Sequence, residues 1–586
     1  MILCLEVTGF PEYMQKILDL ISNEVAAAFK ACDYDEKYGK VSVSNRPDLC
    51  EFQCNGAMAA AKEYKCAPIK IAENVLSKLA DNSLFSKAEA VNPGFINLNL
   101  SEHALCDYLN NMQAAPLLGC EKKEADTIII DYGGPNVAKP LHVGHLRSAI
   151  IGESIKRNAK YLGLNVIGDI HLGDWGLQMG LIIHELSIRK PDLVYFDDKY
   201  TGDYPEDAPF TISELEEIYP CASGKSKEDA AYKEAAMTAT KELQSGRRGY
   251  RALWKHILNV SFELWNGESD VQDVIPGMVE KLKATGLAYE SDGALVVDVK
   301  EDTDTKEVPP CMILKSDGAS LYNTTDLATL TVRVDQYKPS KIIYVVDKRQ
   351  DLYFEQVFRC SRKTGIVPEE VGLKFIGFGT MNGKDGKPFK TRAGGVMRLE
   401  SLLNEIEEEM YKKITSNHTV DDAEARDTAR KVALSAIKYG DLSNQASKDY
   451  VFDVERFTSF EGNTGPYILY TIVRIKSILN KYNEANKLPA EARINAASNE
   501  YEKALMLELC KYNSVIENSY EEYAPHKICS YIYDLSNEFN RFYHETKIIS
   551  EEDKTKQAGW IKLLMLTKEV LESCIDILGF SAPERM

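Results

Sequence analysis

The sequence contains few of the features that would remove it from the class of ordinary globular proteins. No apolar run approaches the ~20 residues that a membrane-spanning helix needs, and there is no internal repeat and no low-complexity tract. Hydrophobic residues make up 44% of the chain and charged residues 27%, a balance that excludes a largely disordered protein. We therefore expect folded domains and no association with a membrane.

The cysteines show no metal-binding or disulfide pattern. All 13 are scattered, and none forms a Cys-x-x-Cys pair. Cys50 and Cys54 have no histidine and no second cysteine pair beside them, so no zinc site and no tightly bound metal are expected. Residues 1–10 lack the basic segment of a secretory signal and the arginines of a transit peptide. These observations predict a soluble protein of the cytoplasm with reduced thiols.

The chain is also short of positive charge. Its 89 acidic residues exceed its 70 basic residues, which gives a net charge of −19. This excess argues against indiscriminate coating of nucleic acid, but it leaves room for a local surface that binds one particular RNA. The length of 586 residues is too great for one hydrophobic core and predicts roughly three to five domains.

Hydrophobic periodicity predicts a small α+β unit in about the first 110 residues. Residues 13–30, 55–64 and 69–81 repeat their apolar positions at the helical period, and residues 94–100 alternate like a half-buried strand. Residues 113–123 combine proline, glycine and several charges, which is typical of a linker.

A second unit alternates strands with helices. The β-branched run at 127–131 ends in two glycines and a proline, and a helical pattern from about 143 to 161 follows it. A second strand is expected at 165–169 and a second helix at 176–188. This order is typical of a parallel βαβ arrangement and predicts a Rossmann-like sheet.

A long insertion is expected to divide this α/β unit. From residue 189 to about 310 the chain changes to loops and highly charged helices, and apolar strands return at 311–314 and 341–346, each followed by a helix. After residue 374 a loop rich in glycine and lysine leads into a C-terminal portion with helical periodicity throughout. The predicted fold class is therefore multidomain α/β with an all-α C-terminal domain.

One motif stands where the first strand gives way to a helix. His142 and His145 lie three positions apart on one face of the first helical turn, where free N–H groups and the positive end of the helix dipole suit a triphosphate. Gly144 permits close approach of an adenine or ribose. By itself such a histidine pair is as consistent with chance or with half a zinc site, and the strand-to-helix context favours nucleotide binding.

This segment resembles a known family. His142-Val-Gly144-His145 resembles the His-Ile-Gly-His signature of class I aminoacyl-tRNA synthetases. Several further segments resemble the arginyl-tRNA synthetase family in particular: Asp131 to Lys139, Gly168 to Gln178, Asn55 to Val75, Tyr322 to Ala328 and Phe460 to Tyr467. The matches extend from about residue 50 to the C-terminus. The resemblance implies a Rossmann-like catalytic domain split by an insertion, preceded by an added N-terminal domain and followed by a helical anticodon-binding domain.

The resemblance also implies how the chain is divided. The expected domains are 1–115 (N-terminal added α+β domain, tRNA contact), 125–190 (catalytic domain, first half), 191–310 (connective insertion), 311–375 (catalytic domain, second half), 376–450 (signature loop and stem-contact region) and 451–586 (helical anticodon-binding domain).

A second phosphate-binding element is expected in the lysine-rich loop, residues 383–392. Its cations among glycines could close over a departing pyrophosphate, although in isolation such a run is more often a solvated hairpin tip. The family has its Lys-Met-Ser-Lys-Ser-type loop here, and the match is loose. We expect Lys390, with Lys387 as the alternative, to stabilise the transition state, and Thr391 and Arg392 to contact ATP with Lys390.

A pocket for arginine must present a carboxylate and neutral acceptors to a planar cation with five donors. Tyr322 and Asp326, four apart, lie on the same side of one predicted helix, and Asp131 ends a strand at the usual mouth of a doubly wound sheet. Without the resemblance, a half-buried core tyrosine and an ordinary helix carboxylate would be the simpler interpretations. The resemblance implies a site for L-arginine that also includes Gly134, Pro135, Asn136, His145 and Gln350.

For tRNA contact, the C-terminal helices offer aromatic side chains that could stack on unpaired bases and cations that could meet phosphates. The predicted residues are Asn463, Tyr467, Tyr470, Arg474 and Lys476. The alternative is a core stripe with snorkelling basic residues at its rim.

These features together predict a monomeric ligase. The resemblance implies that it activates L-arginine with Mg-ATP and transfers it to tRNA(Arg), with adenylate formation dependent on bound tRNA. Two alternatives remain at this stage: another nucleotidyl-transfer enzyme with a His-x-Gly-His motif, and a catalytically silent RNA- or protein-binding homologue. The long helical C-terminus disfavours the first, and the intact set of motif residues disfavours the second.

Overall fold

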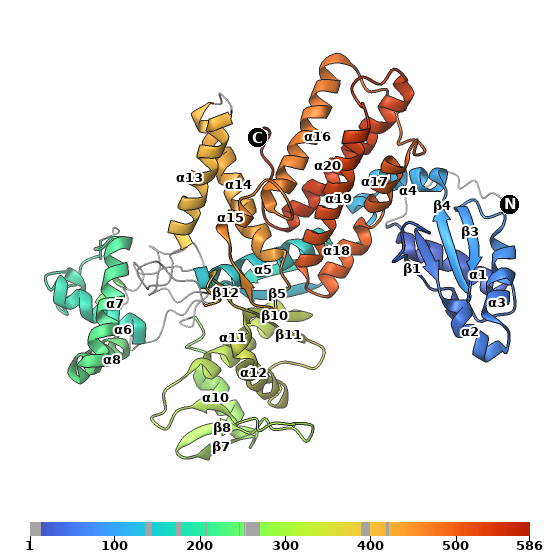
Figure 1. The fold of residues 1–586 in the computed structure, drawn as a ribbon. Coiled ribbons are helices and arrows are strands. Elements are labelled where there is room, and N and C mark those ends of the chain that lie inside the picture. Colours follow the sequence, from blue (N-terminus) through green and yellow to red (C-terminus); the bar gives the residue numbers. More distant parts are fainter. Residues whose placement is uncertain are drawn as a thin grey trace.

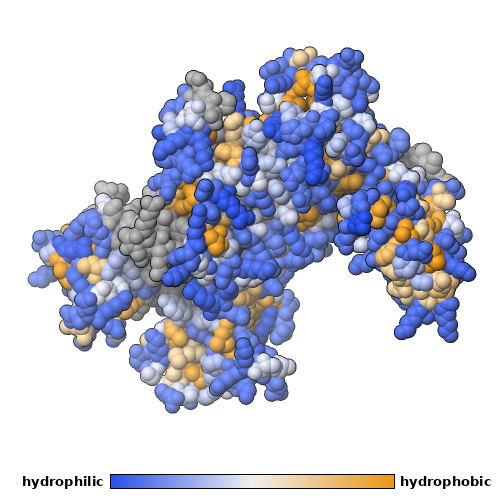
Figure 2. Space-filling model, viewed as in Figure 1, coloured by the Kyte–Doolittle hydropathy of each residue, from blue (hydrophilic) through white to orange (hydrophobic). Residues whose placement is uncertain are grey.

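The computed structural model describes residues 13–134, 143–170, 177–205, 208–244, 247–250, 252–253, 270–387, 399–417 and 421–586. Within these ranges, no helix is both long enough and apolar enough to cross a membrane. The visible face of the molecule is mainly hydrophilic, with small apolar patches on the N-terminal unit and on the unit of β7 and β8 (Figure 2).

The N-terminal unit is an antiparallel sheet covered by helices. Its strands are β1 (Val41–Val43), β2 (Phe52–Cys54), β3 (Phe85–Val91) and β4 (Phe95–Leu100), in the order β1-β2-β4-β3. The helices are α1 (Ile17–Lys30), α2 (Gly56–Tyr64), α3 (Pro68–Leu79) and α4 (Glu102–Ala114). Pro68 begins α3 and the Ser101 side chain caps α4, which are common helix starts. The predicted elements of this unit agree with these bounds to within a few residues.

The segment expected as a linker is packed against the rest of the chain. It contains a short 3-10 helix, η2 (Pro116–Gly119), and the side chains of Leu118 and Cys120 are buried. The Glu121 amide donates to the Glu517 carboxylate in the C-terminal helices at 2.8 Å. A buried backbone needs such partners, so this connection holds the N-terminal unit against the helical part instead of acting as a free tether.

The central sheet is parallel, as predicted. Its strands are β5 (Thr127–Tyr132), β6 (Asn165–Asp169), β10 (Lys341–Asp347) and β11 (Gly372–Phe378), in the order β11-β10-β5-β6. Ile128 and Ile130 pack with α5 (Val143–Tyr161), while Ile129 packs on the other face with α11 (Tyr322–Tyr337) and α12 (Asp351–Lys363). Both faces are thus covered, which explains the continuous apolar runs in these strands.

One strand does not lie where the sequence placed it. β9 (Cys311–Leu314) pairs with β8 (Ala294–Val297), which pairs with β7 (Ala288–Ser291) in a separate antiparallel sheet beside α10 (Ile275–Ala284). Expecting β9 in the parallel sheet was wrong. Its side chains alternate between buried and exposed, whereas the middle of β10 is buried on both faces.

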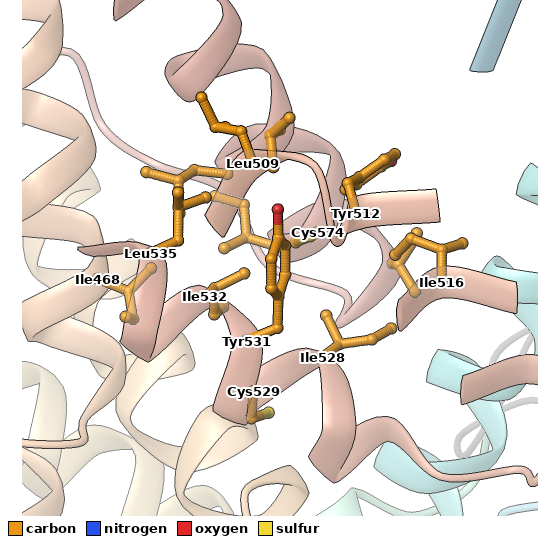
Figure 3. Packing of buried hydrophobic residues seen from close by; sticks show 14 of the residues in the cluster. Ile468, Leu509, Tyr512, Ile516, Ile528, Cys529, Tyr531, Ile532, Leu535 and Cys574 are labelled. Carbon is orange, nitrogen blue, oxygen red and sulfur yellow. The ribbon is translucent and has the colours of Figure 1, made fainter. Parts of the chain in front are cut away.

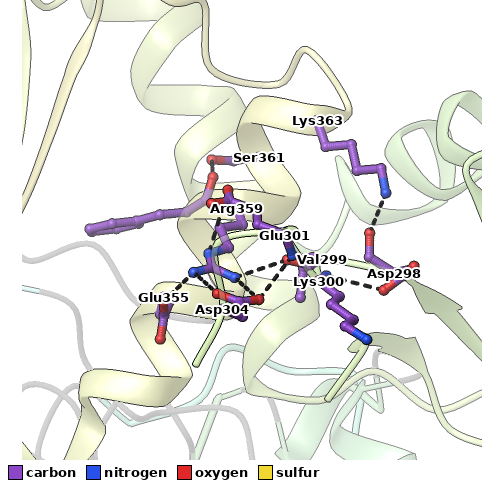
Figure 4. Close-up of polar contacts among 10 residues, drawn as sticks. Asp298, Val299, Lys300, Glu301, Asp304, Glu355, Arg359, Ser361 and Lys363 are labelled. Atoms are coloured by element: carbon purple, nitrogen blue, oxygen red, sulfur yellow. Dashed lines mark hydrogen bonds and ion pairs between the residues drawn. The ribbon is translucent and has the colours of Figure 1, made fainter. Parts of the chain in front are cut away.

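Arg359 of α12 holds this antiparallel unit in place (Figure 4). Its guanidinium makes two hydrogen bonds to Asp304, at 2.7 and 2.8 Å, and a third to the Val299 carbonyl at 3.2 Å. Glu355, one turn earlier on α12, accepts at 2.5 Å. The segment after β8 is therefore clamped to α12 by charge-assisted bonds.

A helical unit follows β6 and lies to one side of the molecule (Figure 1). It consists of α6 (Leu177–Arg189), η3 (Val194–Phe196), α7 (Ile212–Glu228) and α8 (Ala230–Gln244). At its centre the buried Glu185 accepts from the Tyr232 hydroxyl at 2.5 Å and from Lys225 and Arg189 at 2.9 Å each. Burial alone would raise the pKa of Glu185, but these donors outweigh it and lower the pKa to about 2.

The remaining helices stand on the side of the central sheet opposite the β7–β9 unit (Figure 1). They are α13 (Leu399–Asn417), α14 (Asp422–Leu442), α15 (Val454–Phe457), α16 (Gly465–Ala485), α17 (Glu500–Leu509), α18 (Tyr512–Glu521), α19 (Pro525–Glu545) and α20 (Lys554–Ile577). A short parallel pair, β12 (Met381–Asn382) and β13 (Tyr450–Val451), ties the segment after β11 to this part. Tyr531 of α19 lies at the centre of an apolar core that also includes Leu535 of the same helix (Figure 3).

Candidate active site

Two aspartates meet at the carboxyl edge of the central sheet. Asp131 is the last residue but one of β5 and Asp169 ends β6, and the two are paired in register. The Arg333 guanidinium of α11 lies between them, with Nη2 2.5 Å from Asp131 Oδ2 and 2.7 Å from Asp169 Oδ2. Its Nη1 donates to the Tyr344 hydroxyl of β10 at 2.8 Å. A buried arginine thus neutralises part of the charge that the strand ends bring together.

The pKa values in this cluster follow from burial and from the neighbouring charges. Burial lowers the pKa of Arg333, but its neighbours Tyr344, Asp131 and Asp169 outweigh this effect and raise that pKa well above its usual value. Burial also raises the pKa of Tyr344, and Asp326 raises it further while Arg333 opposes the shift. Tyr344 therefore stays protonated and lies within the field of three carboxylates.

Asp326 is held by a side chain from the following helix. Tyr322 and Asp326 occupy the first two turns of α11, and the Tyr322 ring is 62% exposed. The hydroxyl of Tyr353, on α12, donates a hydrogen bond to the Asp326 carboxylate. Burial raises the pKa of Tyr353 well above its ordinary value, as does the charge of Asp326. Gln350 ends the short helix η4 (Lys348–Gln350) and occupies the N-cap position of α12 without a side-chain capping bond, three positions before Tyr353.

The sequence predicted Asp131, Tyr322, Asp326 and Gln350 for this region, but it did not indicate Arg333, Tyr344 or Tyr353. Arg333 follows an apolar stretch of α11, and a charged residue on a buried helix face is the signal that was missed. The two tyrosines carry no such signal, because most tyrosines in strands and helices are structural.

Ser148 of α5 joins the ends of two strands. Its hydroxyl accepts from the Gly133 amide at 2.7 Å and donates to the Val345 carbonyl of β10 at 2.6 Å. Gly133 has a φ of 73°, a conformation that glycine adopts without strain. The chain can therefore turn sharply at the end of β5, directly before Gly134, which is exposed.

Several predicted residues lie outside the described part of the chain: Pro135, Asn136, His142, Lys390, Thr391 and Arg392. Gly144 and His145 fall in the first turn of α5, as expected, but the His145 side chain is not among those described. Their roles stay predictions.

The described part of the lysine-rich loop is a tight turn. The Gly383 amide donates to the Lys387 carbonyl at 2.8 Å, and the Lys387 amide donates to Asp385 Oδ1 at 3.1 Å. The Lys387 side chain is exposed, whereas the Lys384 ammonium lies 3.2 Å from Asp453. Among the described residues, Lys384 therefore has a carboxylate partner, and Lys387 is exposed with no ion pair described for it.

The predicted tRNA contacts differ in how accessible they are. The Tyr470 ring is 40% exposed, and the Arg474 guanidinium lies 4.7 Å from its centroid. The Tyr467 hydroxyl is bonded to Asn537 and Asn540 of α19.

Two further predicted residues are engaged within the protein. Asn463 accepts from the Tyr439 hydroxyl at 2.5 Å. The Lys476 ammonium is 2.7 Å from Glu584 and 3.3 Å from Glu572. Tyr470 is thus exposed, while the half-buried Arg474 donates to Asn540 Oδ1 of α19 at 2.5 Å and Lys476 is paired with two carboxylates.

Three protein-family models match the chain. The class I tRNA synthetase (R) catalytic domain matches residues 109–454, the DALR anticodon binding domain matches 468–586, and the arginyl tRNA synthetase N-terminal domain matches 15–100. Together they cover all three parts described above.

Full-length relatives and solved structures agree with these matches. The chain is 64% identical to the arginine–tRNA ligase of Agathobacter rectalis and 56% identical to that of Alkaliphilus oremlandii, in each case over 98% of this chain and 100% of the relative. Its fold is similar to that of the Plasmodium falciparum arginyl-tRNA synthetase (TM-score 0.77, 24% identity, 98% of this chain and 100% of that one). The Thermus thermophilus arginyl-tRNA synthetase is also similar in fold (TM-score 0.74, 21% identity, 97% and 100%).

The catalytic-domain model covers more than half of the chain, and the identity to full-length relatives extends over nearly all of it. The chain therefore belongs to the arginyl-tRNA synthetase family of class I aminoacyl-tRNA synthetases, the arginine–tRNA ligases.

Proposed function

We propose that the chain activates L-arginine with ATP and transfers it to tRNA(Arg) in two steps. The arginine carboxylate attacks the α-phosphorus of ATP, which forms arginyl-adenylate and releases pyrophosphate. The 2′-hydroxyl of the terminal adenosine of tRNA then attacks the activated carbonyl, which forms arginyl-tRNA and releases AMP and a proton. A carboxylate is already a nucleophile, so the protein contributes mainly positioning and charge stabilisation.

The excess of negative charge around Tyr344 is the observation that carries this proposal. Asp131, Asp169 and Asp326 all act on this tyrosine, and Arg333 supplies one compensating positive charge among them. Such a group favours a second cation, and a guanidinium fits carboxylate acceptors better than an ammonium does. We assign the substrate's guanidinium to Asp326, Asp131 and Tyr322.

The substrate's amino and carboxylate ends are assigned to residues around the sheet edge. Gly134 and Gln350 are described there, and Pro135, Asn136 and His145 follow from the family resemblance. For ATP, we assign the start of α5 with His142, Gly144 and His145, because a helix N-terminus favours phosphate. Lys387, Lys390, Thr391 and Arg392 complete the ATP site from the lysine-rich loop.

Magnesium accompanies ATP as its usual counter-ion. Mg²⁺ prefers phosphate and water oxygens and commonly takes only one or two protein carboxylates. Within the described ranges no group of three or more His, Cys, Asp or Glu side chains is arranged to hold a metal, so the phosphates would supply most of the ligands.

We further propose how the parts of the chain divide the work. Residues 1–115 contact tRNA, 125–190 and 311–375 form the catalytic domain, 191–310 are its insertion, 376–450 contact the acceptor stem, and 451–586 bind the anticodon. The family-model matches support the three main divisions. The twelve described cysteines are all free, which supports a reducing compartment such as the cytoplasm. A monomer is the expected state, and size-exclusion chromatography with light scattering tests it.

Amino-acid-dependent pyrophosphate exchange tests the main proposal. Each of the twenty amino acids is assayed with ATP, with and without a tRNA(Arg) transcript. We expect exchange with arginine alone among the twenty, and we expect it to require the transcript. No exchange with arginine plus tRNA would refute the proposed reaction, and exchange without tRNA would refute the requirement for tRNA.

A further inference from the structure

Arg147 is a buried arginine on α5, two positions after His145. Its guanidinium reaches three acceptors from two distant parts of the chain. Nε lies 3.0 Å from Asp441 Oδ1 of α14, and Nη1 donates to the carbonyls of Gly379 at 2.7 Å and Lys448 at 3.0 Å. The side chains of Arg147 and Asp441 are 2% and 0% exposed. This cluster lies where α5, α14 and β12 meet near the middle of the molecule (Figure 1).

The Gly379 carbonyl belongs to the loop base, residues 379–382, from which the lysine-rich loop departs. A Cβ at position 379 would come within 2.5 Å of the Lys448 carbonyl oxygen and of Asp449 Oδ1, so the two segments approach closely only because this residue is glycine. The Gly379 amide donates to the Ala446 carbonyl, and Asp449 accepts from the Thr380 amide. The loop base is therefore held against the segment that follows α14, and Arg147 binds both.

Asp441 connects the same guanidinium to the helical part of the chain. Two positions before it on α14, the Tyr439 hydroxyl donates to Asn463, one of the residues predicted to contact tRNA, at 2.5 Å. It also lies 2.8 Å from the Cys529 carbonyl of α19. The Asn463 side chain is exposed, whereas Tyr439 and Asp441 are fully buried. Tyr439 and Asp441 both lie on α14, so a shift of this helix would move the contact with Asn463 and the contact with Arg147 together.

The Arg147–Asp441 pair is only half bonded. Among the described residues, Arg147 Nη2 and Asp441 Oδ2 are buried without a hydrogen-bond partner. A two-point contact between guanidinium and carboxylate would satisfy both atoms, and buried unsatisfied groups are costly. A small shift of α14 relative to α5 that brought these two atoms together would turn the present one-point contact into a tighter two-point contact.

We propose that Arg147 is a positioning residue through which tRNA bound to the helical domain raises the rate of adenylate formation. Binding on the α14–α16 side favours the tighter contact with Asp441, which draws the loop base against α5. The lysine-rich loop and the start of α5 would then hold the ATP phosphates in position for attack by the arginine carboxylate. This inference rests on the proposed function, because it concerns the rate of that reaction and its dependence on tRNA.

The test is pyrophosphate exchange with arginine as a function of the concentration of a tRNA(Arg) transcript. Asp441→Asn keeps the size of the side chain but removes its charge, and Arg147→Lys keeps the charge but cannot reach all three acceptors. We expect Asp441→Asn to lower the tRNA-saturated rate about tenfold. The arginine KM and the tRNA concentration for half-maximal rate should stay within about twofold of wild type. The tRNA-saturated rate of Arg147→Lys should lie between that of wild type and that of Asp441→Asn.

Arg157 provides a matched control. It lies on the same helix and also bonds to the C-terminal part, with Nη1 3.0 Å from Asp576 of α20, but none of its hydrogen bonds or ion pairs involves the loop base. Arg157→Met should leave the tRNA-saturated rate within about twofold of wild type. Tyr439→Phe keeps the Arg147–Asp441 ion pair and removes the hydrogen bond to Asn463. It should also lower the tRNA-saturated rate, and it provides the test if Asp441→Asn or Arg147→Lys fails to fold.

Hydrogen exchange separates this role from a merely structural one. In wild type, tRNA should slow amide exchange in residues 379–387 and 444–452, and in Asp441→Asn and Tyr439→Phe this protection should be lost while tRNA still binds. Variants with wild-type rates and wild-type protection would overturn the inference. Equal losses in Arg157→Met would also overturn it. If wild type itself shows no exchange with arginine and tRNA, the proposed function fails instead.

Discussion

The hydroxyl of Tyr353 on α12 donates a hydrogen bond to the carboxylate of Asp326 on α11. The carboxylate assigned to the substrate's guanidinium is therefore oriented by a second residue, and that residue stays protonated because burial and the charge of Asp326 raise its pKa. A carboxylate with one oxygen held in place presents its other acceptor sites in a defined plane, which is what a planar cation needs.

Tyr353→Phe should weaken arginine binding without affecting ATP. Removal of the hydroxyl takes away a hydrogen bond that orients the Asp326 carboxylate, so we expect the arginine KM in the exchange assay to rise about tenfold, with the ATP KM and kcat nearly unchanged. Tyr337→Phe, at the exposed end of the same helix α11, is the matched control and should behave as wild type. An unchanged arginine KM in Tyr353→Phe would refute the orienting role.

Asp326→Ala should have a larger effect of the same kind. Loss of the charged partner of a bound cation commonly costs a few kcal/mol, and Asp326 is half-buried, so the arginine KM should rise about 100-fold while ATP binding stays near normal. The measurement is the same exchange assay with arginine varied at saturating ATP. If the arginine KM does not change, Asp326 does not bind the guanidinium.

Arg333→Met should destabilise the fold. It would leave Asp131 and Asp169 adjacent and buried without their shared cation, and breaking a buried ion pair in this way costs about 3–5 kcal/mol. Urea denaturation followed by circular dichroism measures the loss. Arg359→Met is the comparison, because Arg359 also binds carboxylates (Figure 4), but the side chains of two of them, Glu301 and Glu355, are 56% and 40% exposed. It should cost about 1 kcal/mol, and equal losses in the two variants would contradict this ranking.

Glu185→Gln should reveal a pH-dependent contribution to stability. The folded-state pKa of Glu185 is lowered to about 2 from an ordinary value of 4.5, so its contribution is complete above about pH 4.5 and is lost as the pH falls toward 2. We expect the variant to be less stable than wild type at pH 7 by on the order of 2 kcal/mol, because Lys225 and Arg189 are partly in solvent. The difference should narrow between pH 4.5 and pH 3. Denaturant unfolding at pH 7, 4.5 and 3 measures it, and a difference that is constant with pH would contradict the assignment.

Tyr470 and Lys476 should respond differently to substitution, although both were predicted to contact tRNA. Tyr470→Ala should weaken tRNA binding by about 5- to 100-fold, the usual range for loss of one stacked base. Lys476→Met should leave tRNA binding unchanged and cost stability, because its ammonium is paired with Glu572 and Glu584. Filter binding at two salt concentrations, together with thermal unfolding, distinguishes the two results. Weakened tRNA binding in Lys476→Met would show that the pair opens to release the lysine.

Local structure was well predicted where periodicity is strong. The expected helix at about 143–161 coincides with α5, and the expected strand at 341–346 coincides with β10 to within one residue. Family membership, fold class and ligase activity were also confirmed, because the motifs that carry the resemblance are short and local. The sheet to which β9 belongs was not predicted correctly. The pairing of a short strand depends on which strand edge is available in the folded protein.

The site shows the same division between local and distant information. Tyr322, Asp326 and Gln350 could be proposed from spacing and resemblance, but Arg333 and Tyr353 could not. Their importance comes from contacts with Asp131, 202 positions away, and with Asp326, 27 positions away. Lys476 shows the reverse case: a lysine near an aromatic residue looks available in the sequence, and the structure pairs its ammonium with two carboxylates, while its contact with tRNA stays a prediction.

The sequence by itself determined the order of the helices and strands, the family and the reaction, because helical and strand periods and short motifs are read within a few residues. Only the tertiary structure decided which charges neutralise each other: Arg147 with Asp441 across 294 positions, and Arg333 with Asp131 and Asp169. The physical reason is that Coulomb energy and the cost of burial depend on distance in space and on exclusion of water, neither of which is encoded at a fixed spacing along the chain.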